Sequence, residues 1–173
     1  DYMLKLRSSN KDIVEDYAKE FSAKGGSASG GKVKFIPNKK PWEIKVDVAL
    51  PCATQNEIYE EDAKELLKNG CFCVCEGANM PTPIEAYNIF RDAKILYAPG
   101  KASNAGGVAT SGLEMSQNSM RLPWSREEVD KRLHEIMVRI HDTCVPTAER
   151  FGAPGNYVNG ANIAGFLKVA DAM

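Results

Sequence analysis

The chain contains five cysteines and two histidines, residue types that often bind transition metals or form disulfides. Cys71, Cys73 and Cys75 alternate with other residues, so in a strand their thiols would share one face, where cysteine packs as a small apolar side chain. A zinc site needs a second pair of ligands, and the sequence offers none. His134 and His141 lack the spacing and the carboxylate partner of a helical metal site. We therefore expect packed thiols, histidines that face solvent or a partner, and no metal.

Three segments combine small residues with amide or hydroxyl groups that could bind a small molecule: residues 51–56, 76–82 and 98–112. Such a backbone can approach a flat ring closely, and Asn79 offers both a donor and an acceptor to a carboxamide. Lys101 lies in the third segment, but the phosphate-binding pattern G-x-x-x-x-G-K-[ST] is absent, and no G-x-G-x-x-G turn follows an expected strand. A simpler alternative is that the small residues only allow tight packing and that Asn79 only makes a turn.

The surrounding elements decide whether these segments meet. Apolar patterning predicts strands at 44–50, 71–76 and 94–98, alternating with helices at 55–68 and 83–92. This order favours a parallel sheet with right-handed crossovers, in which the carboxyl ends of the strands share one edge. Ligands of such sheets bind at that edge, so three unusual segments there favour a binding site.

Further helices are expected outside the sheet. Apolar spacing predicts a short helix at 12–21, a long amphipathic helix at 125–144 and a last helix after Asn159-Gly160. A run rich in Gly and Ser at 23–32 is expected to be a surface loop. Asn69-Gly70 predicts a left-handed helix end. The S/T-x-x-E spacing of a capping box occurs at three expected helix starts: Thr54 with Glu57, Thr82 with Glu85, where Pro83 would be the first helical residue, and Ser125 with Glu128.

Length and composition limit the class of protein. With 173 residues, 43% hydrophobic and 26% charged, the chain suits one globular core and has no apolar run that could span a membrane. Its net charge of −1 gives no basic surface for nucleic acid or a lipid membrane. The odd number of cysteines favours a reducing, cytoplasmic setting. Because the chain opens at Asp1 without a methionine, we expect it to be part of something longer.

Four runs carry a specific family resemblance: DVALPCATQNE (47–57), EGANMPT (76–82), APGKASNAGGVATSGLEMSQNS (98–119) and NYVNGANIAGFLKVADAM (156–173). They resemble the C-terminal half of the coenzyme domain of glutamate dehydrogenases, and the third run is closest to the NADP-linked hexameric enzymes. The resemblance extends from about Tyr2 to Met173. It implies an α/β fold: a Rossmann-like parallel sheet, the second half of a dinucleotide-binding domain, at 1–122, with a helical C-terminal segment at 123–173 packed on it.

The resemblance also implies a reaction and a coenzyme. The reaction is the reversible oxidative deamination of L-glutamate to 2-oxoglutarate and ammonia, with a hydride passed between the substrate α-carbon and the nicotinamide of NADP. Asn79 would bind the nicotinamide end of the coenzyme, and Ala53 and Thr54 would line its ribose. Asn104 would lie where substrate and nicotinamide meet.

On the substrate side, the resemblance implies that Val108 packs on the glutamate side chain and that Ser111 hydrogen-bonds its distal carboxylate. A site that bonds a substrate group rejects analogues that lack it, so Ser111 disfavours a leucine- or phenylalanine-type dehydrogenase. A buried carboxylate also needs a positive partner, and none is evident in the sequence.

The catalytic Lys and Asp of the family, its substrate-binding lysines, the G-x-G-x-x-G turn and the strand that selects NAD or NADP would all precede Asp1. We therefore expect no catalytic residue in this chain, which would form one wall of the cleft. The remainder of the same polypeptide would supply the other, in a homohexamer. The alternative is a non-catalytic nucleotide-binding or assembly module of Rossmann-like fold.

The implied role of Ser111 predicts a selective defect. In an enzyme assembled around this chain, Ser111→Ala should raise the KM for glutamate about tenfold or more, with less effect on norvaline, which lacks the distal carboxylate. Steady-state kinetics with both substrates would measure this, and equal losses on both would contradict the carboxylate role.

Overall fold

The structure is a computed structural model that describes residues 8, 13–23 and 33–173. It divides into two compact units, Asp1–Pro41 and Trp42–Met173. In the first unit, α2 (Ile13–Ala23) carries Tyr17 stacked on Phe21, with ring centroids 4.4 Å apart. The predicted first helix is therefore confirmed. Asp12 and residues 24–32 of the Gly- and Ser-rich run lie outside the described residues.

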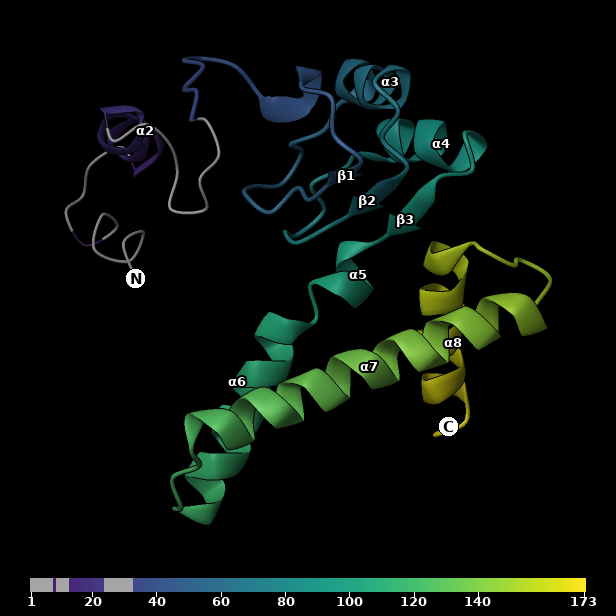
Figure 1. Ribbon diagram of the computed structural model, residues 1–173. Coiled ribbons are helices and arrows are strands. Elements are labelled where there is room, and N and C mark those ends of the chain that lie inside the picture. The colour runs from purple at the N-terminus through teal and green to yellow at the C-terminus, as the bar shows by residue number, and fades with distance from the viewer. Residues whose placement is uncertain (1–7, 9–12, 24–32) are drawn as a thin grey trace. The chain divides into compact units, whose positions relative to one another are not determined.

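The second unit contains a three-stranded parallel sheet in the order β1 (Val48–Ala49), β2 (Cys73–Cys75) and β3 (Leu96–Ala98) (Figure 1). Val48 pairs with Cys73, and Val74 pairs with Tyr97. The prediction of an α/β fold with a parallel sheet is confirmed, although each strand occupies only part of its predicted range.

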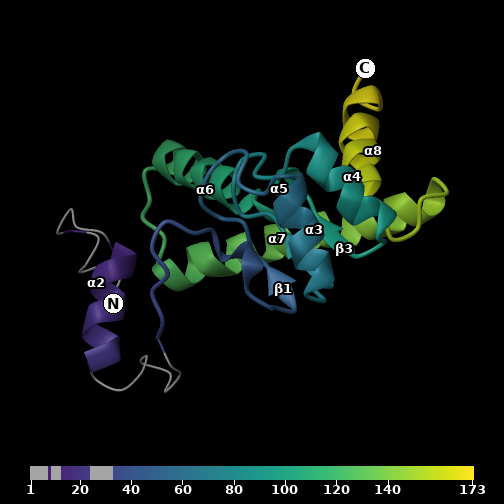
Figure 2. The ribbon, with the colours of Figure 1, turned by 90° about the horizontal axis from the view of Figure 1, so that it is seen from above.

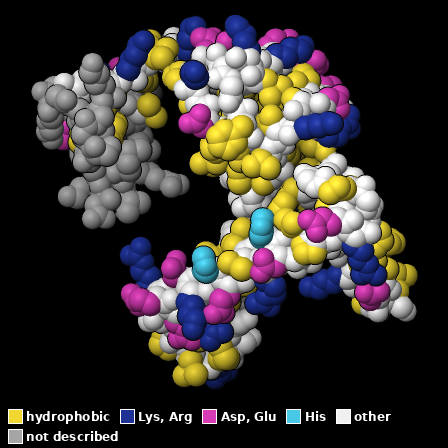
Figure 3. Space-filling model, turned by 45° about the vertical axis from the view of Figure 1, so that its right-hand side comes forward, with side chains coloured by type: hydrophobic (Ala, Val, Ile, Leu, Met, Phe, Trp, Pro, Cys, Tyr) yellow, Lys and Arg dark blue, Asp and Glu magenta, His cyan; other side chains and the backbone are white. Residues whose placement is uncertain are grey.

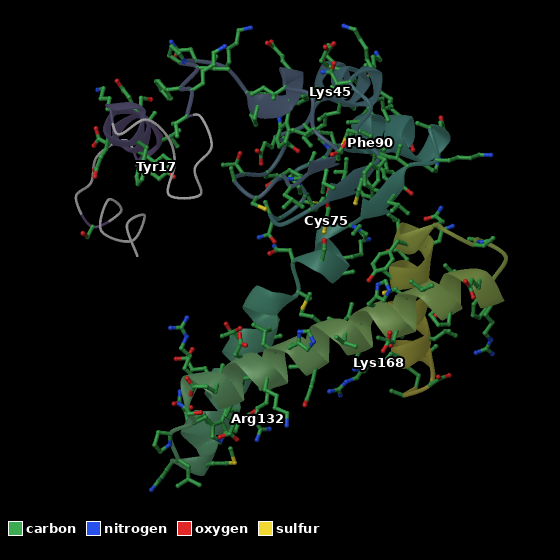
Figure 4. All side chains as sticks on the ribbon, viewed as in Figure 1. Tyr17, Lys45, Cys75, Phe90, Arg132 and Lys168 are labelled. Atoms are coloured by element: carbon green, nitrogen blue, oxygen red, sulfur yellow. The ribbon has the colours of Figure 1, made fainter. Side chains whose placement is uncertain are left out.

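Two helices, α3 (Glu60–Lys68) and α4 (Ile84–Asp92), alternate with the strands and lie on one side of the sheet (Figure 1). The cluster between them and the sheet is apolar, and the side chains of Leu66, Val74 and Phe90 are fully buried in it (Phe90 is labelled in Figure 4). Because successive strand residues point to opposite faces, the burial of Val74 directs the flanking cysteines of β2 away from this core.

Helix α3 begins at Glu60, later than the predicted residue 55. The backbone N–H groups of Asn56 and Ile58 donate to the carbonyls of Met80 and Pro81, at 3.0 and 2.9 Å. In a helix that began at residue 55, the Ile58 N–H would donate to the Thr54 carbonyl, so its bond to Pro81 competes with the helix. Asn56 also has a left-handed φ of 54°, which interrupts a helix at that residue. Helix α3 therefore begins only at Glu60, after the residues that are bonded to Met80 and Pro81.

Two of the predicted helix ends are confirmed. The Ser125 hydroxyl accepts a hydrogen bond from the Glu128 backbone N–H at 3.1 Å and caps the helix that begins at Arg126. Gly70 has a φ of 87°, and the N–H groups of Gly70 and Cys71 donate to the last carbonyls of α3, those of Leu67 and Leu66, both at 3.0 Å. This is the Schellman arrangement, which requires a left-handed residue at Gly70.

The other two capping predictions are wrong. The Glu57 carboxylate accepts hydrogen bonds from the N–H groups of Ala53 and Thr54, at 3.1 and 3.4 Å, and so orders the loop before the helix. At α4, Pro83 has extended backbone and takes the cap position, so the helix begins one residue later than predicted and no side chain caps it.

The pattern of strands and helices predicts a loop at 98–112, after the third strand, and this is also wrong. Most of the segment is helical: α5 (Gly100–Ser103) and the first half of α6 (Gly106–Met120). Gly106 and Gly107 open α6 without positive φ, so they act as small helical residues. The hydroxyls of Thr110 and Ser111 donate back to the carbonyls of Gly106 and Gly107, at 2.9 and 3.3 Å.

Two longer helices complete the chain, α7 (Arg126–Arg150) and α8 (Tyr157–Ala170). Helices α6 and α7 form a hairpin (Figure 2), and the predicted division between residues 122 and 123 falls in its turn and stays a prediction. Helix α7 continues past its predicted end through Pro146. Helix α8 begins earlier than predicted because the Asn156 side chain caps it, accepting from the Asn159 N–H at 3.0 Å.

Helix α8 contacts both α7 and β3. At its closest approach to α7, Gly160 is buried, and a Cβ atom there would overlap the Cys144 carbonyl and lie 3.2 Å from the Ala148 Cβ. Only glycine allows this crossing of the two helices. Within the described residues, no helix combines the length and apolarity that crossing a membrane requires.

This crossing predicts the effect of adding one methyl group. Gly160→Ala should lower the free energy of unfolding by about 1–3 kcal/mol, because the methyl group pushes the two helices apart. Gly165→Ala in the same helix is the matched control: nothing lies within 4 Å of its Cβ position, so helix propensity should raise stability by up to about 1 kcal/mol. Urea denaturation followed by circular dichroism would measure both, and equal effects would contradict the crossing constraint.

Candidate functional site

The three segments singled out in the sequence meet at the carboxyl edge of the sheet. The Gly77 N–H donates to the Pro51 carbonyl at 2.9 Å and joins the first segment to the second. The Glu76 N–H donates to the Ala98 carbonyl at 3.0 Å and joins the second segment to the third. These bonds extend the parallel pairing beyond the strands and hold the three segments together.

Close packing explains why residues here are small. A Cβ atom at Gly77 would overlap the Cys52 Sγ, and one at Gly100 would lie 2.6 Å from the Ala78 carbonyl oxygen. Glycine therefore lets the backbone at Gly100 pack on the backbone of Ala78, and it lets the backbone at Gly77 pack on the Cys52 side chain. Part of the simpler alternative, that small residues serve tight packing, thus holds at Gly77 and Gly100.

A buried carboxylate lies at the centre of this edge. Glu76 is only 5% exposed, and its carboxylate accepts hydrogen bonds from the Tyr97 hydroxyl and from the Gly100 N–H, the latter at 2.6 Å. Burial and the bond to Glu76 raise the pKa of Tyr97 far above its ordinary value, so the phenol remains the donor. Sequence reasoning did not single out Glu76; the available signal was a charged residue ending an apolar strand.

A cleft of about 790 Å³ opens beside this network. The Asn104 side-chain amide lies 3.5 Å from the Asn79 Oδ1, so two amides from different segments converge at its wall. Lys101 supplies a cation to the lining, and its Nζ donates to the Asn162 Oδ1 of α8 at 2.6 Å. The lining includes, besides these, the side chains of Gln55, Met80, Val108 and Ile140.

The predicted site residues fall into two groups. Asn79, Asn104 and Val108 line the cleft, and Val108 is 80% exposed there. Ala53 and Thr54 are exposed in the preceding loop and do not line it, and neither does Ser111, which is exposed on the next turn of α6. Neither Gln55 nor Lys101 is among the predicted site residues, and Lys101 lacks the surrounding phosphate-binding pattern.

Cys52 lies in the first of these segments against Gly77, and the other cysteines and both histidines lie elsewhere. All five thiols are free, and the described residues contain no group of side chains that could hold a metal ion. Cys73 and Cys75 (Cys75 is labelled in Figure 4) line a cavity of about 600 Å³ between the sheet and α7. Burial raises the pKa of Cys73 and disfavours its thiolate. Both histidines are exposed on α7 (cyan in Figure 3), and His141 stacks on Tyr157.

Three parallel strands with small-residue segments at their carboxyl edge define part of a Rossmann-like dinucleotide-binding domain. The chain belongs to the glutamate/leucine/phenylalanine/valine dehydrogenase family, whose model matches residues 1–173.

Relatives and solved structures agree with this assignment. The NAD-specific glutamate dehydrogenase of Bacteroides fragilis is 57% identical over 100% of this chain and 37% of the relative. The NADP-specific glutamate dehydrogenase of Escherichia coli is 53% identical over 99% of this chain and 36% of the relative. A solved glutamate dehydrogenase superposes with a TM-score of 0.89 at 48% identity, over 99% of this chain and 36% of that one. The Plasmodium falciparum enzyme gives 0.77 at 52% identity, over 80% and 30%.

The chain spans little more than a third of the length of these relatives. Their coenzymes are also mixed, because one relative is NAD-specific, another NADP-specific and a third, from Xylanibacter ruminicola, is NAD(P)-specific. The relatives therefore differ among themselves in coenzyme.

The buried phenol of Tyr97 predicts a pH dependence. A pKa raised in the folded state gives stability that is present below the ordinary tyrosine value of about 10 and is lost as the pH rises above it, because only the unfolded chain then releases the proton. Tyr97→Phe should therefore make the fall in unfolding free energy above about pH 10 less steep, by up to about 1.4 kcal/mol per pH unit. Denaturant titrations at several alkaline pH values would test this, and an unchanged slope would contradict it.

Proposed function

We propose that this chain supplies the nicotinamide-side wall of a glutamate dehydrogenase, which interconverts L-glutamate with 2-oxoglutarate and ammonium using NAD(P). The observation that carries the proposal is the convergence of the Asn79 and Asn104 amides in a cleft at the carboxyl ends of parallel strands. Ligands of open parallel sheets bind at that edge, and the family assignment names the chemistry.

On the coenzyme side, Asn79 contacts the nicotinamide carboxamide, because its amide matches the donor and acceptor of that group. Ala53 and Thr54 line the ribose from the loop that Glu57 orders. Asn104 lies between the nicotinamide and the substrate, which its contact with Asn79 supports.

On the substrate side, the exposed Val108 packs on the glutamate side chain, since an apolar side chain 80% open to the cleft is available for a ligand. Ser111, one turn further along α6, hydrogen-bonds the distal carboxylate once the substrate extends past Val108. Lys101 is the cation among the described residues of the cleft lining, and its contact with Asn162 holds it there.

The carboxylate that takes part in acid–base chemistry comes from the remainder of the same polypeptide, because the described cleft lining contains no Asp or Glu. The catalytic lysine comes from there too, as the resemblance implies, since Lys101 is held by Asn162. The same remainder supplies the pyrophosphate turn and selects the coenzyme; we propose NADP, on the resemblance of residues 98–119. The complete enzyme is a cytoplasmic homohexamer. In it, residues 1–122 belong to the coenzyme domain and residues 123–173 form the helical segment packed on it.

Segment exchange tests the proposal. The chain should replace the matching segment of the Bacteroides fragilis or the Escherichia coli relative, and each chimera should keep reductive amination within about tenfold of its host, because more than half of the exchanged residues are identical. Each should also keep the coenzyme preference of its host, measured as kcat/KM with NADH and NADPH.

The outcomes separate the alternatives. A folded chimera without turnover would contradict the enzymatic role and support a nucleotide-binding or assembly module. If the coenzyme preference of the chimera changed with the inserted chain, this would contradict the proposal that residues outside the chain select the coenzyme. The 173-residue chain alone should show no turnover and only weak binding of NADPH, so turnover by the purified chain would contradict the placement of the acid and base groups.

A further inference from the structure

Glu76 is the one charged side chain buried among the described residues. Removing a carboxylate from water is costly unless donors replace the lost hydration. The sequence-based roles leave Glu76 without a task, although it begins the segment that contains Asn79. Its burial therefore calls for an explanation in terms of what it holds.

Each oxygen of the Glu76 carboxylate binds a different element. Oε1 accepts from the Tyr97 hydroxyl on β3, and Oε2 accepts from the Gly100 N–H, the first residue of α5, at 2.6 Å. The backbone carbonyl of Glu76 accepts from the Ser103 hydroxyl, the last residue of α5, also at 2.6 Å. Both ends of this short helix are thus bound to Glu76, the residue that follows β2.

The helix held in this way carries one wall of the cleft. Asn104 directly follows α5, and Asn79 lies three residues after Glu76. The two amides are 3.5 Å apart, and the contacts of Glu76 with Gly100 and Ser103 act on this gap together with the packing of Gly100 on Ala78. No other described hydrogen bond between side chains joins residues 76–82 to residues 100–104.

We propose that Glu76 is a positioning residue, whose carboxylate sets the spacing of Asn79 and Asn104 by holding α5 against the end of β2. It does not contact the coenzyme. The inference rests on the proposed function in that these amides receive the nicotinamide. Without the charge, α5 would shift relative to residues 76–82, and the nicotinamide would be held less accurately for hydride transfer.

The test uses Glu76→Gln, which keeps the shape but removes the charge, with Glu65→Gln as the matched control. Glu65 also accepts two side-chain donors, from Lys68 and Asn69, but at the far end of α3. In the active chimera, Glu76→Gln should raise the coenzyme KM about tenfold or more, because a charge-assisted hydrogen bond is lost. The primary isotope effect with 2-deuterated glutamate should also increase.

A second measurement does not depend on activity. In the 173-residue chain, Glu76→Gln should move the side-chain amide NMR signals of Asn79 and Asn104, and Glu65→Gln should leave them in place. If Glu76→Gln does not fold, Tyr97→Phe removes one donor, keeps the Gly100 bond, and should give smaller changes in the same direction.

The outcomes distinguish the two proposals. Unmoved amide signals together with an unchanged coenzyme KM would overturn the positioning role while the proposed function stands. Moved signals in a chain whose chimeras are inactive would support the positioning role while the proposed function fails. A lower melting temperature with an unchanged KM and isotope effect would show a merely structural role and overturn the inference.

Discussion

Parallel pairing of β1, β2 and β3 determines where every candidate site residue lies. A parallel strand needs a crossover to return the chain to its starting edge, so each strand delivers its following segment to the same edge. The pairing continues past the strands through the bonds from Gly77 to Pro51 and from Glu76 to Ala98. Segments far apart in the sequence therefore form one surface.

Helices α3 and α4 cover only one face of the sheet, and the surface also depends on this arrangement. The apolar cluster around Val74 and Phe90 holds these helices in place, while the opposite face, with Cys73 and Cys75, looks toward α7 across a cavity. The long C-terminal helices reach this side through the contact of α8 with β3. The glycine crossing at Gly160 then fixes α8 against α7, and Lys101 connects α8 to the cleft.

Much of this was accessible from the sequence because its signals are local. The alternation of apolar strands with helices predicts the parallel sheet, and Asn69-Gly70 and Ser125 indicate helix ends from side-chain and backbone properties alone.

The predictions are wrong where residues distant in the sequence determine the local structure. Residues 55–58 have a helix-start pattern, but backbone bonds to Met80 and Pro81 overrule it. Glu76 was missed for the same reason, since its donors come from β3 and α5. The small residues of 98–112 indicate a backbone that a ligand can approach, but Gly106 and Gly107 are ordinary helical residues of α6.

The bonds from Asn56 and Ile58 to Met80 and Pro81 have a mechanical consequence. They join two loops that follow different strands, and Asn79 lies next to Met80 at this connection. Separating the two loops would break these backbone hydrogen bonds and leave the N–H of the buried Ile58 without its partner. The loop with Ala53 and Thr54 is therefore held to the segment that carries Asn79.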